Sequence, residues 1–94
     1  MQNFSTEEIY GSLLEKCIDA FSMNKFNFSL QPEYIRICKR LKGTKYEDEV
    51  RKYVQDVISF ILNRIENSYK KSYEVTSDIQ VINWLDVLDY LDNK

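Results

Sequence analysis

The chain has 94 residues, of which 44% are hydrophobic and 30% charged, with two glycines and one proline. This composition is typical of one globular domain over residues 1–94 and excludes a disordered or multidomain chain. At this length, folding buries only about 60 to 65% of the surface of the unfolded chain, so a large enclosed substrate cavity is not expected.

Histidine is absent, and the formal net charge is -2. Histidine is the commonest general base near neutral pH and the commonest metal ligand, so its absence argues against an enzyme and against a metal site. We therefore expect a non-enzymatic protein without catalytic residues, metal or cofactor. The small negative charge gives no overall attraction to nucleic acid or to an anionic membrane.

Localisation is indicated by what the sequence lacks and by its two cysteines. The N-terminal residues do not form a signal peptide, and the longest nearly apolar run, 57–62, is interrupted by Ser59. Cys17 and Cys38 have no further cysteine or histidine to complete a metal site, so buried free thiols are expected. Free thiols suit a reducing compartment, and we expect a cytoplasmic protein without membrane contact. The many Ile, Lys, Asn and Tyr residues are typical of AT-rich genes, as in a phage or an AT-rich microbe.

The first predicted helix covers residues 5–22. Ser5 and Glu8 have the spacing of a capping box, which satisfies backbone N–H groups at a helix start. Apolar residues recur at helical spacing and form one continuous face. This face consists of Ile9, Tyr10, Leu13, Leu14, Cys17, Ile18 and Phe21.

Residues 23–31 break the helical period, because polar and apolar residues alternate there. A single strand would have no partner in this chain, so we expect a loop. Its apolar side chains are expected to anchor it on the helices. They are Phe26, Phe28 and Leu30.

The second predicted helix covers residues 32–42. Pro32 suits its first turn, and Gly43 suits the position just after its end. Its apolar residues again share one side, which should face the core. They are Tyr34, Ile37, Cys38 and Leu41.

The third predicted helix, 44–70, is the longest. Thr44 and Glu47 repeat the capping-box spacing. The apolar seam, close to a heptad repeat, consists of Val50, Tyr53, Val54, Val57, Ile58, Ile61 and Ile65. At 1.5 Å per residue the helix spans roughly 38 Å, more than the second helix can cover. Some of its surface must therefore meet another segment, another copy or a partner.

A polar hinge over residues 72–77 is expected before a fourth helix over residues 78–92. The main apolar face of this helix consists of Val81, Trp84, Leu85, Val87, Leu88 and Leu91. Three further apolar residues fall outside that face: Ile79, Ile82 and Tyr90. The predicted fold is all-α, an antiparallel bundle of four unequal helices with a long third helix.

Acidic residues gather along one side of the fourth predicted helix. Asp78, Asp86, Asp89 and Asp92 project within about 60° of one line on an ideal helix. A solvated helix face explains such a row, and the alternative is a surface for a basic partner. The carboxylates lack the ligand spacing of a calcium loop.

Basic residues gather between the second and third predicted helices. The segment contains Arg36, Lys39, Arg40, Lys42 and Lys45. Cations near a helix C-terminus stabilise the helix dipole, which accounts for them without a ligand. The alternative is a phosphate-binding site with Tyr34 or Tyr46 as a stacking platform, hence a nucleic-acid-binding module.

Two short motifs occur in the chain: Leu30-Gln31-Pro32-Glu33-Tyr34 and Ile61-Leu62-Asn63-Arg64-Ile65. The order of the predicted helices resembles that of the helical A-domain of GINS-family replication subunits, and the two motifs lie at the corresponding places. That family has a Leu-Pro-Glu-Asp-Phe-Tyr element and an Arg-x-x-Lys-Ile helix end, so Ile61 replaces the expected arginine. The resemblance implies an assembly subunit of DNA replication whose long helix packs against sister subunits. In size and architecture the chain is also similar to small helical immunity proteins and phage-encoded inhibitors.

The sequence favours a protein-binding function, as an inhibitor, immunity or adaptor protein. The assembly subunit and the nucleic-acid-binding module are the alternatives. We expect another protein, with a basic surface, as the partner, and a homodimer is a further expectation. The predicted partner-binding residues are Ile79, Ile82, Asp86, Asp89 and Tyr90, with Tyr69 and Tyr73 as a second candidate.

Overall fold

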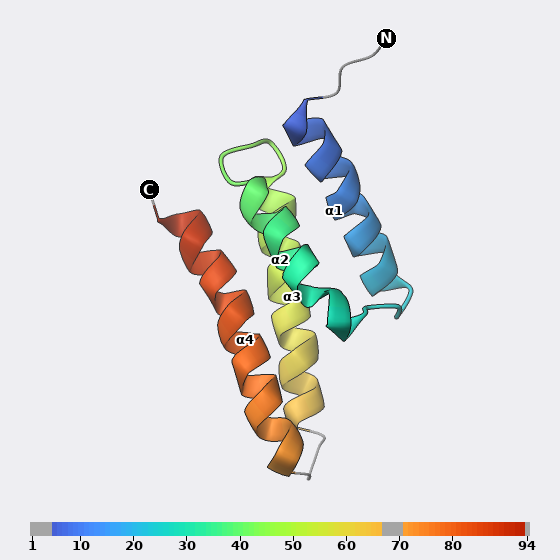
Figure 1. Cartoon of the computed structure of the whole chain (residues 1–94), viewed down its shortest axis with the longest axis vertical. Helices are drawn as coiled ribbons and strands as arrows, with labels where there is room; N and C mark the ends of the chain where they lie inside the picture. Colours follow the sequence, from blue (N-terminus) through green and yellow to red (C-terminus); the bar gives the residue numbers. More distant parts are fainter. Residues whose placement is uncertain (1–4, 67–70, 94) are drawn as a thin grey trace. The chain divides into compact units, whose positions relative to one another are not determined.

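The computed structural model describes residues 5–66 and 71–93, with side chains in 5–63 and 80–93. Over the described residues it contains four α-helices, one 3-10 helix and no strand, which confirms the all-α prediction. The chain divides into two compact units, Met1–Val50 and Arg51–Lys94. The single domain and the single four-helix bundle stay predictions. Figure 1 shows the helices of each unit.

The first helix, α1 (Thr6–Ser22), begins as predicted. Ser5 is its N-cap, and the Ser5 hydroxyl accepts a hydrogen bond from the Glu8 N–H at 3.1 Å. The buried residues of α1 are Gly11, Leu14 and Cys17. Ile9 is 49% exposed and Leu13 is 36% exposed, so the buried face of α1 is narrower than the apolar face that the sequence predicts.

A left-handed residue ends α1. Asn24 has a φ of 60°, a conformation that asparagine adopts more readily than most residues. The Asn24 N–H donates to the Phe21 carbonyl at 3.1 Å, and the Lys25 N–H donates to the Ala20 carbonyl at 2.7 Å. These two bonds are those of a Schellman motif, which satisfies the last carbonyl groups of the helix.

The predicted loop contains a short 3-10 helix, η1 (Phe28–Leu30). The Asn27 side chain accepts a hydrogen bond from the Ser29 N–H at 3.0 Å and caps this turn. Phe28 is half-buried, whereas Leu30 is 43% exposed, so the expected anchoring by Leu30 is wrong. The buried Gln31 side chain donates to the Phe28 carbonyl at 3.1 Å and holds η1 against the next helix.

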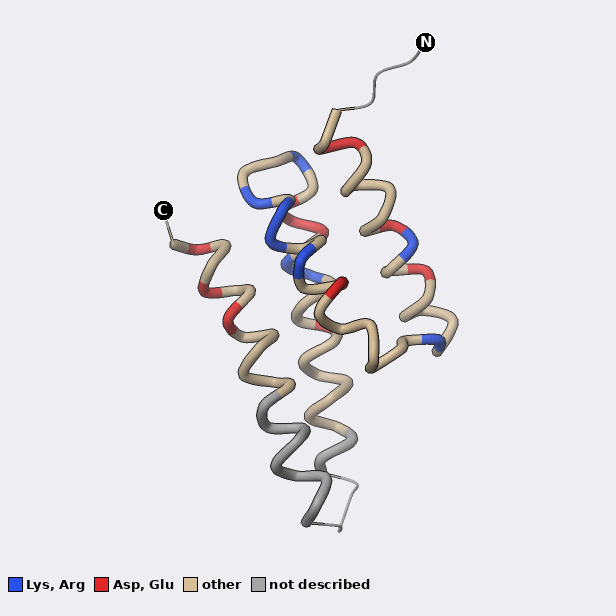
Figure 2. Tube along the Cα trace, in the orientation of Figure 1, with Lys and Arg blue, Asp and Glu red and all other residues tan. Residues whose placement is uncertain are grey.

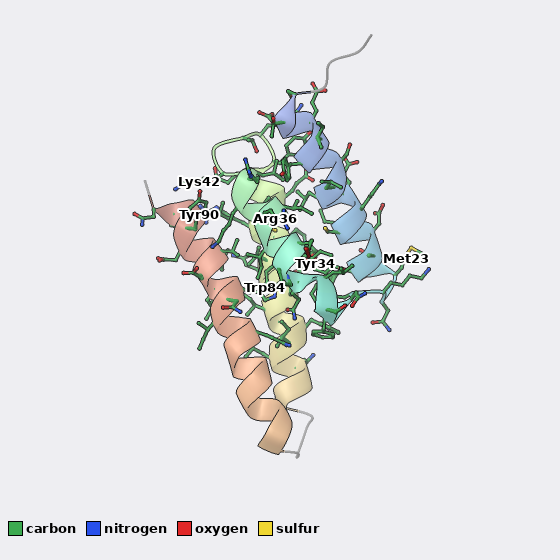
Figure 3. All side chains as sticks on the ribbon, viewed as in Figure 1. Met23, Tyr34, Arg36, Lys42, Trp84 and Tyr90 are labelled. Carbon is green, nitrogen blue, oxygen red and sulfur yellow. The ribbon has the colours of Figure 1, made fainter. Side chains whose placement is uncertain are left out.

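The second helix, α2 (Gln31–Arg40), has Pro32 in its first turn, as predicted. Tyr34, Cys38 and Leu41 are buried. The Tyr34 ring contacts the Phe26 ring with centroids 5.1 Å apart, and its hydroxyl accepts a hydrogen bond from the Asn27 N–H at 3.3 Å. These contacts join the loop to α2 (Figure 3).

The turn after α2 differs from the prediction in one respect. Gly43 has a φ of 78°, which suits its expected role after the helix end. The Thr44 hydroxyl, however, donates to the Leu41 carbonyl at 2.6 Å and accepts from the Tyr46 N–H at 3.2 Å. Thr44 therefore stabilises the turn, and α3 (Glu47–Glu66) begins two residues later than a cap at Thr44 requires.

The second unit contains α3 from Arg51 onward and α4 (Lys71–Asp92), which lie side by side (Figure 1). Arg51 pairs with Asp92, and Tyr53 contacts Trp84, so the start of α3 lies near the end of α4 and the two helices are antiparallel. The buried residues from the two helices are Tyr53, Val54, Val57, Ile58, Ile61, Val81, Trp84, Val87 and Leu91.

The predicted hinge over 72–77 is wrong, because α4 includes these residues. Neither glycine nor proline occurs between 71 and 80. The serine and threonine residues there have lower helix propensity than alanine by only a few tenths of a kcal/mol each, which does not stop a helix. None of the helices in the described segments is long and apolar enough to cross a membrane.

Candidate protein-binding site

The described members of the predicted partner-binding set lie on the outward side of α4. Ile82 is 62% exposed and Tyr90 is 44% exposed. Asp86 and Asp89 are also exposed. Positions 82, 86 and 89 follow each other at helical spacings of four and three, so their side chains share one side of the helix. The structure thus brings four predicted residues onto one surface.

Leu85 is a member of this surface that the sequence prediction missed. It was expected in the core, but its side chain is 48% exposed. Leu85 follows Ile82 by three positions and precedes Asp89 by four, so it lies next to both on the helix surface. The sequence contains a signal for this exposure, because the helical spacing places Leu85 at the border between the buried and the outward sides of α4. We call Ile82, Leu85, Asp86, Asp89 and Tyr90 the α4 face.

Between residues 80 and 93, the opposite side of α4 is buried. Trp84, which is labelled in Figure 3, is fully buried. Its ring meets the Tyr53 ring edge to face with centroids 5.9 Å apart. Val87 and Leu91 continue this buried side toward the C-terminus. The α4 face is therefore carried by a helix whose rotation about its axis is fixed by aromatic and aliphatic packing.

An ion pair joins the C-terminal end of α4 to α3. The Arg51 guanidinium lies 2.6 Å from the Asp92 carboxylate, and the two side chains are 33% and 65% exposed. Pairs this exposed contribute at most about 1 kcal/mol to stability because water screens them. The pair therefore helps to orient α3 and α4 but contributes little to the free energy of unfolding.

The electrostatic character of the α4 face is negative. Between residues 80 and 93 the sequence has acidic residues but no lysine or arginine (Figure 2). Asp86, Asp89 and Asp92 are exposed. Among the described residues, no group of three or more Cys, Asp or Glu side chains is placed to hold a metal ion. The arrangement offers apolar area with carboxylates beside it, as in surfaces that bind proteins.

For the remaining predicted partner-binding residues, the structure does not describe the side chains. Tyr69 falls between the two described segments, at 67–70. Tyr73 and Ile79 belong to α4, but their side chains are outside the description, as is that of Asp78. Their role in binding stays a prediction.

Figure 2 shows the positions of the basic segment at the end of α2 and in the turn after it. Its side chains make several contacts within their own unit. The Arg36 guanidinium lies 3.4 Å from the Glu33 carboxylate. Arg40 lies over the Tyr10 ring, 5.6 Å from its centroid. Tyr34, one of the expected stacking platforms for a base, is buried and therefore does not serve as one.

The other cations of this segment are arranged along the same stretch of chain. Lys39 and Lys42 are half-buried, and Lys45 is exposed. Lys45 lies over the ring of Tyr46, 5.4 Å from its centroid, so the second expected platform already holds a cation of this chain. Neither expected platform is therefore open to a base, because Tyr34 is buried and the ring of Tyr46 is occupied by Lys45.

Cys17 and Cys38 are buried free thiols, as predicted. Burial raises the pKa of Cys38, and the neighbouring Cys17 raises it further. Burial also raises the pKa of Cys17. Because the thiolate is the nucleophile and the metal ligand, a raised pKa disfavours both roles at neutral pH.

Comparison with known protein families, with curated proteins and with solved structures finds no match to this chain. The resemblance of its two motifs to the GINS A-domain stays a prediction.

Proposed function

We propose that the protein is a non-enzymatic protein-binding module that acts as an inhibitor, immunity or adaptor protein through the α4 face. The observation that carries this proposal is the pair of neighbouring aliphatic residues Ile82 and Leu85, which are 62% and 48% exposed. They stand on a helix whose other side, between residues 80 and 93, is buried around Trp84.

Two physical effects support protein binding at this place. Fully burying an aliphatic side chain stabilises a complex by about 1.5 to 3 kcal/mol, so covering the exposed parts of Ile82 and Leu85 favours association. Tyr90, at the side of the pair, is a residue type that often contributes strongly to interfaces. Asp86 and Asp89 add charges that guide a partner of opposite sign and exclude others.

Affinity capture from the native host cells tests the proposal. The full chain is immobilised beside the variant Ile82→Asp with Tyr90→Ala, and captured proteins are identified by mass spectrometry. Ile9→Asp is the matched control, because Ile9 is also half-exposed but lies on α1. Circular dichroism of each variant verifies that the helices are intact.

The proposal predicts a protein that the wild-type chain and the Ile9→Asp control retain and that the α4 double variant loses. Retention of the same proteins by all three chains, with unchanged circular dichroism, contradicts binding through the α4 face.

A further inference from the structure

We infer that the partner of the α4 face is an amphipathic helix with lysine or arginine beside its apolar side, rather than a second copy of this chain. The inference rests on the proposed function and specifies the chemistry of the partner. It is carried by the alternation of apolar and acidic residues along one side of α4.

The apolar part of the surface is narrow. Ile82 and Leu85 are three positions apart and both about half or more exposed, so they form a row one helical turn long. Helices that dock on such a row do so through apolar residues at spacings of three, four and seven. A single helix therefore matches the width of the apolar row.

A carboxylate lies one turn beyond each apolar residue. Asp86 follows Ile82 by four positions, and Asp89 follows Leu85 by four, and both carboxylates are exposed. A partner helix with cations one turn from its own apolar residues places them near these carboxylates. Complementary charge at this rim gives specificity and raises the association rate.

A second copy does not supply these cations through the same face. Contact of α4 with α4 of another copy is isologous, so each residue meets residues of the same segment. No lysine or arginine occurs between positions 80 and 93, so contact of this stretch with itself sets Asp86 and Asp89 against acidic, uncharged polar or apolar residues and never against a cation. Nucleic acid is disfavoured for the same reason, because its phosphates repel the carboxylates.

Two synthetic peptides provide the probe. Each has about 18 residues, which gives five helical turns, with leucine along one side. The first peptide has lysine at the flanking positions and the second has glutamate there. Binding of each peptide to the full chain is measured by isothermal titration calorimetry at physiological and at raised salt.

The lysine peptide is expected to bind the wild-type chain about tenfold or more tightly than the glutamate peptide, and less tightly as salt rises. Charge reversal by Asp86→Lys with Asp89→Lys is expected to invert this preference. The matched control is Glu15→Lys with Asp19→Lys, which changes the net charge equally on α1, where both residues are exposed. The control is expected to keep the preference for lysine.

The apolar row has its own variant. Ile82→Ser is expected to weaken binding of the lysine peptide about tenfold, whereas Ile9→Ser leaves it unchanged. Circular dichroism establishes that each variant folds. Equal binding of the two peptides, absence of binding, or a preference that survives charge reversal overturns the inference.

Sedimentation equilibrium of the chain alone tests the second copy. A monomer is expected, and a dimer that Ile82→Ser dissociates contradicts the inference. If host proteins are still captured through Ile82 while the lysine peptide is not preferred, the inference fails and the proposed function stands. If capture does not depend on Ile82, the proposed function fails as well.

Discussion

The ring of Tyr46 packs directly against Gly11 in the middle of α1. A Cβ atom at position 11 would lie 2.6 Å from Cε2 and 2.8 Å from Cε1 of Tyr46, well inside the distance at which carbon atoms attract. Glycine inside a helix costs about 0.5 to 1 kcal/mol relative to alanine. The close approach of Tyr46 explains why this helix nevertheless contains a glycine.

Gly11→Ala is therefore expected to lower the free energy of unfolding by about 1 kcal/mol, because displacing the Tyr46 ring outweighs the gain in helix propensity. In a Tyr46→Ala background the same change is expected to raise it by about 0.5 to 1 kcal/mol. Urea unfolding followed by circular dichroism measures the four chains of this cycle. An equal effect of Gly11→Ala in both backgrounds would show that the two residues do not interact.

Trp84→Ala and Ile82→Ala are expected to differ strongly although the two residues belong to the same helix. Trp84 is fully buried against Tyr53, so its loss should cost about 3 to 5 kcal/mol. Ile82 is 62% exposed, and its truncation should change stability by less than about 0.5 kcal/mol. Urea unfolding followed by circular dichroism compares them. Similar losses for both variants would mean that Ile82 is part of the core.

Alkaline pH is expected to destabilise the fold partly through the two cysteines. Burial raises the pKa of Cys38 and of Cys17, so above about pH 8.5 their thiols ionise more readily in the unfolded chain than in the folded chain. The free energy of unfolding then falls as pH rises, whereas below that pH the thiols are protonated in both states and contribute fully.

Urea unfolding at about pH 7 and about pH 10 measures this fall. Cys38→Ala removes one of the thiols and is expected to show a smaller fall than the wild-type chain, while the titration of lysine and tyrosine is common to both. The same fall in both chains would exclude a contribution from Cys38.

Binding to DNA or RNA at physiological salt is expected to be no tighter than a non-specific background, with a Kd of about 1 to 100 μM. Arg36 already faces Glu33, Arg40 lies over Tyr10, and the net charge is negative. Fluorescence anisotropy with labelled oligonucleotides measures this affinity at several salt concentrations. Submicromolar, salt-sensitive binding that Arg40→Ala with Lys42→Ala removes, and Lys16→Ala with Lys25→Ala retains, would restore the nucleic-acid alternative.

Local signals predicted much of the fold because they act within a few residues. The Ser5 cap, the proline in the first turn of α2 and the glycine after it all have their expected roles. Thr44 has the same cap pattern as Ser5, but its hydroxyl bonds to Leu41 and Tyr46 in the turn. The side chain of such a residue can cap a helix or stabilise a turn, and the spacing of the sequence alone does not show which of the two forms.

The candidate site was predicted in part. Periodicity placed Ile82 and Tyr90 outside the main apolar face of α4, and both are exposed. Leu85, Ile9 and Leu13 are apolar and at core spacing, yet they are exposed. An apolar arc on a helix can be wider than the surface that its neighbours cover, and how much they cover depends on packing between segments distant in sequence.

Site-specific photo-crosslinking tests the central claim, that the α4 face binds a protein, most directly. A benzoylphenylalanine is placed at Ile82, or at Ile9 as the control, and the chain is irradiated in its native host cells. The account predicts a crosslinked protein adduct from position 82 that position 9 does not give. An adduct from position 9 alone, or none from position 82 in a chain with unchanged circular dichroism, would contradict the claim.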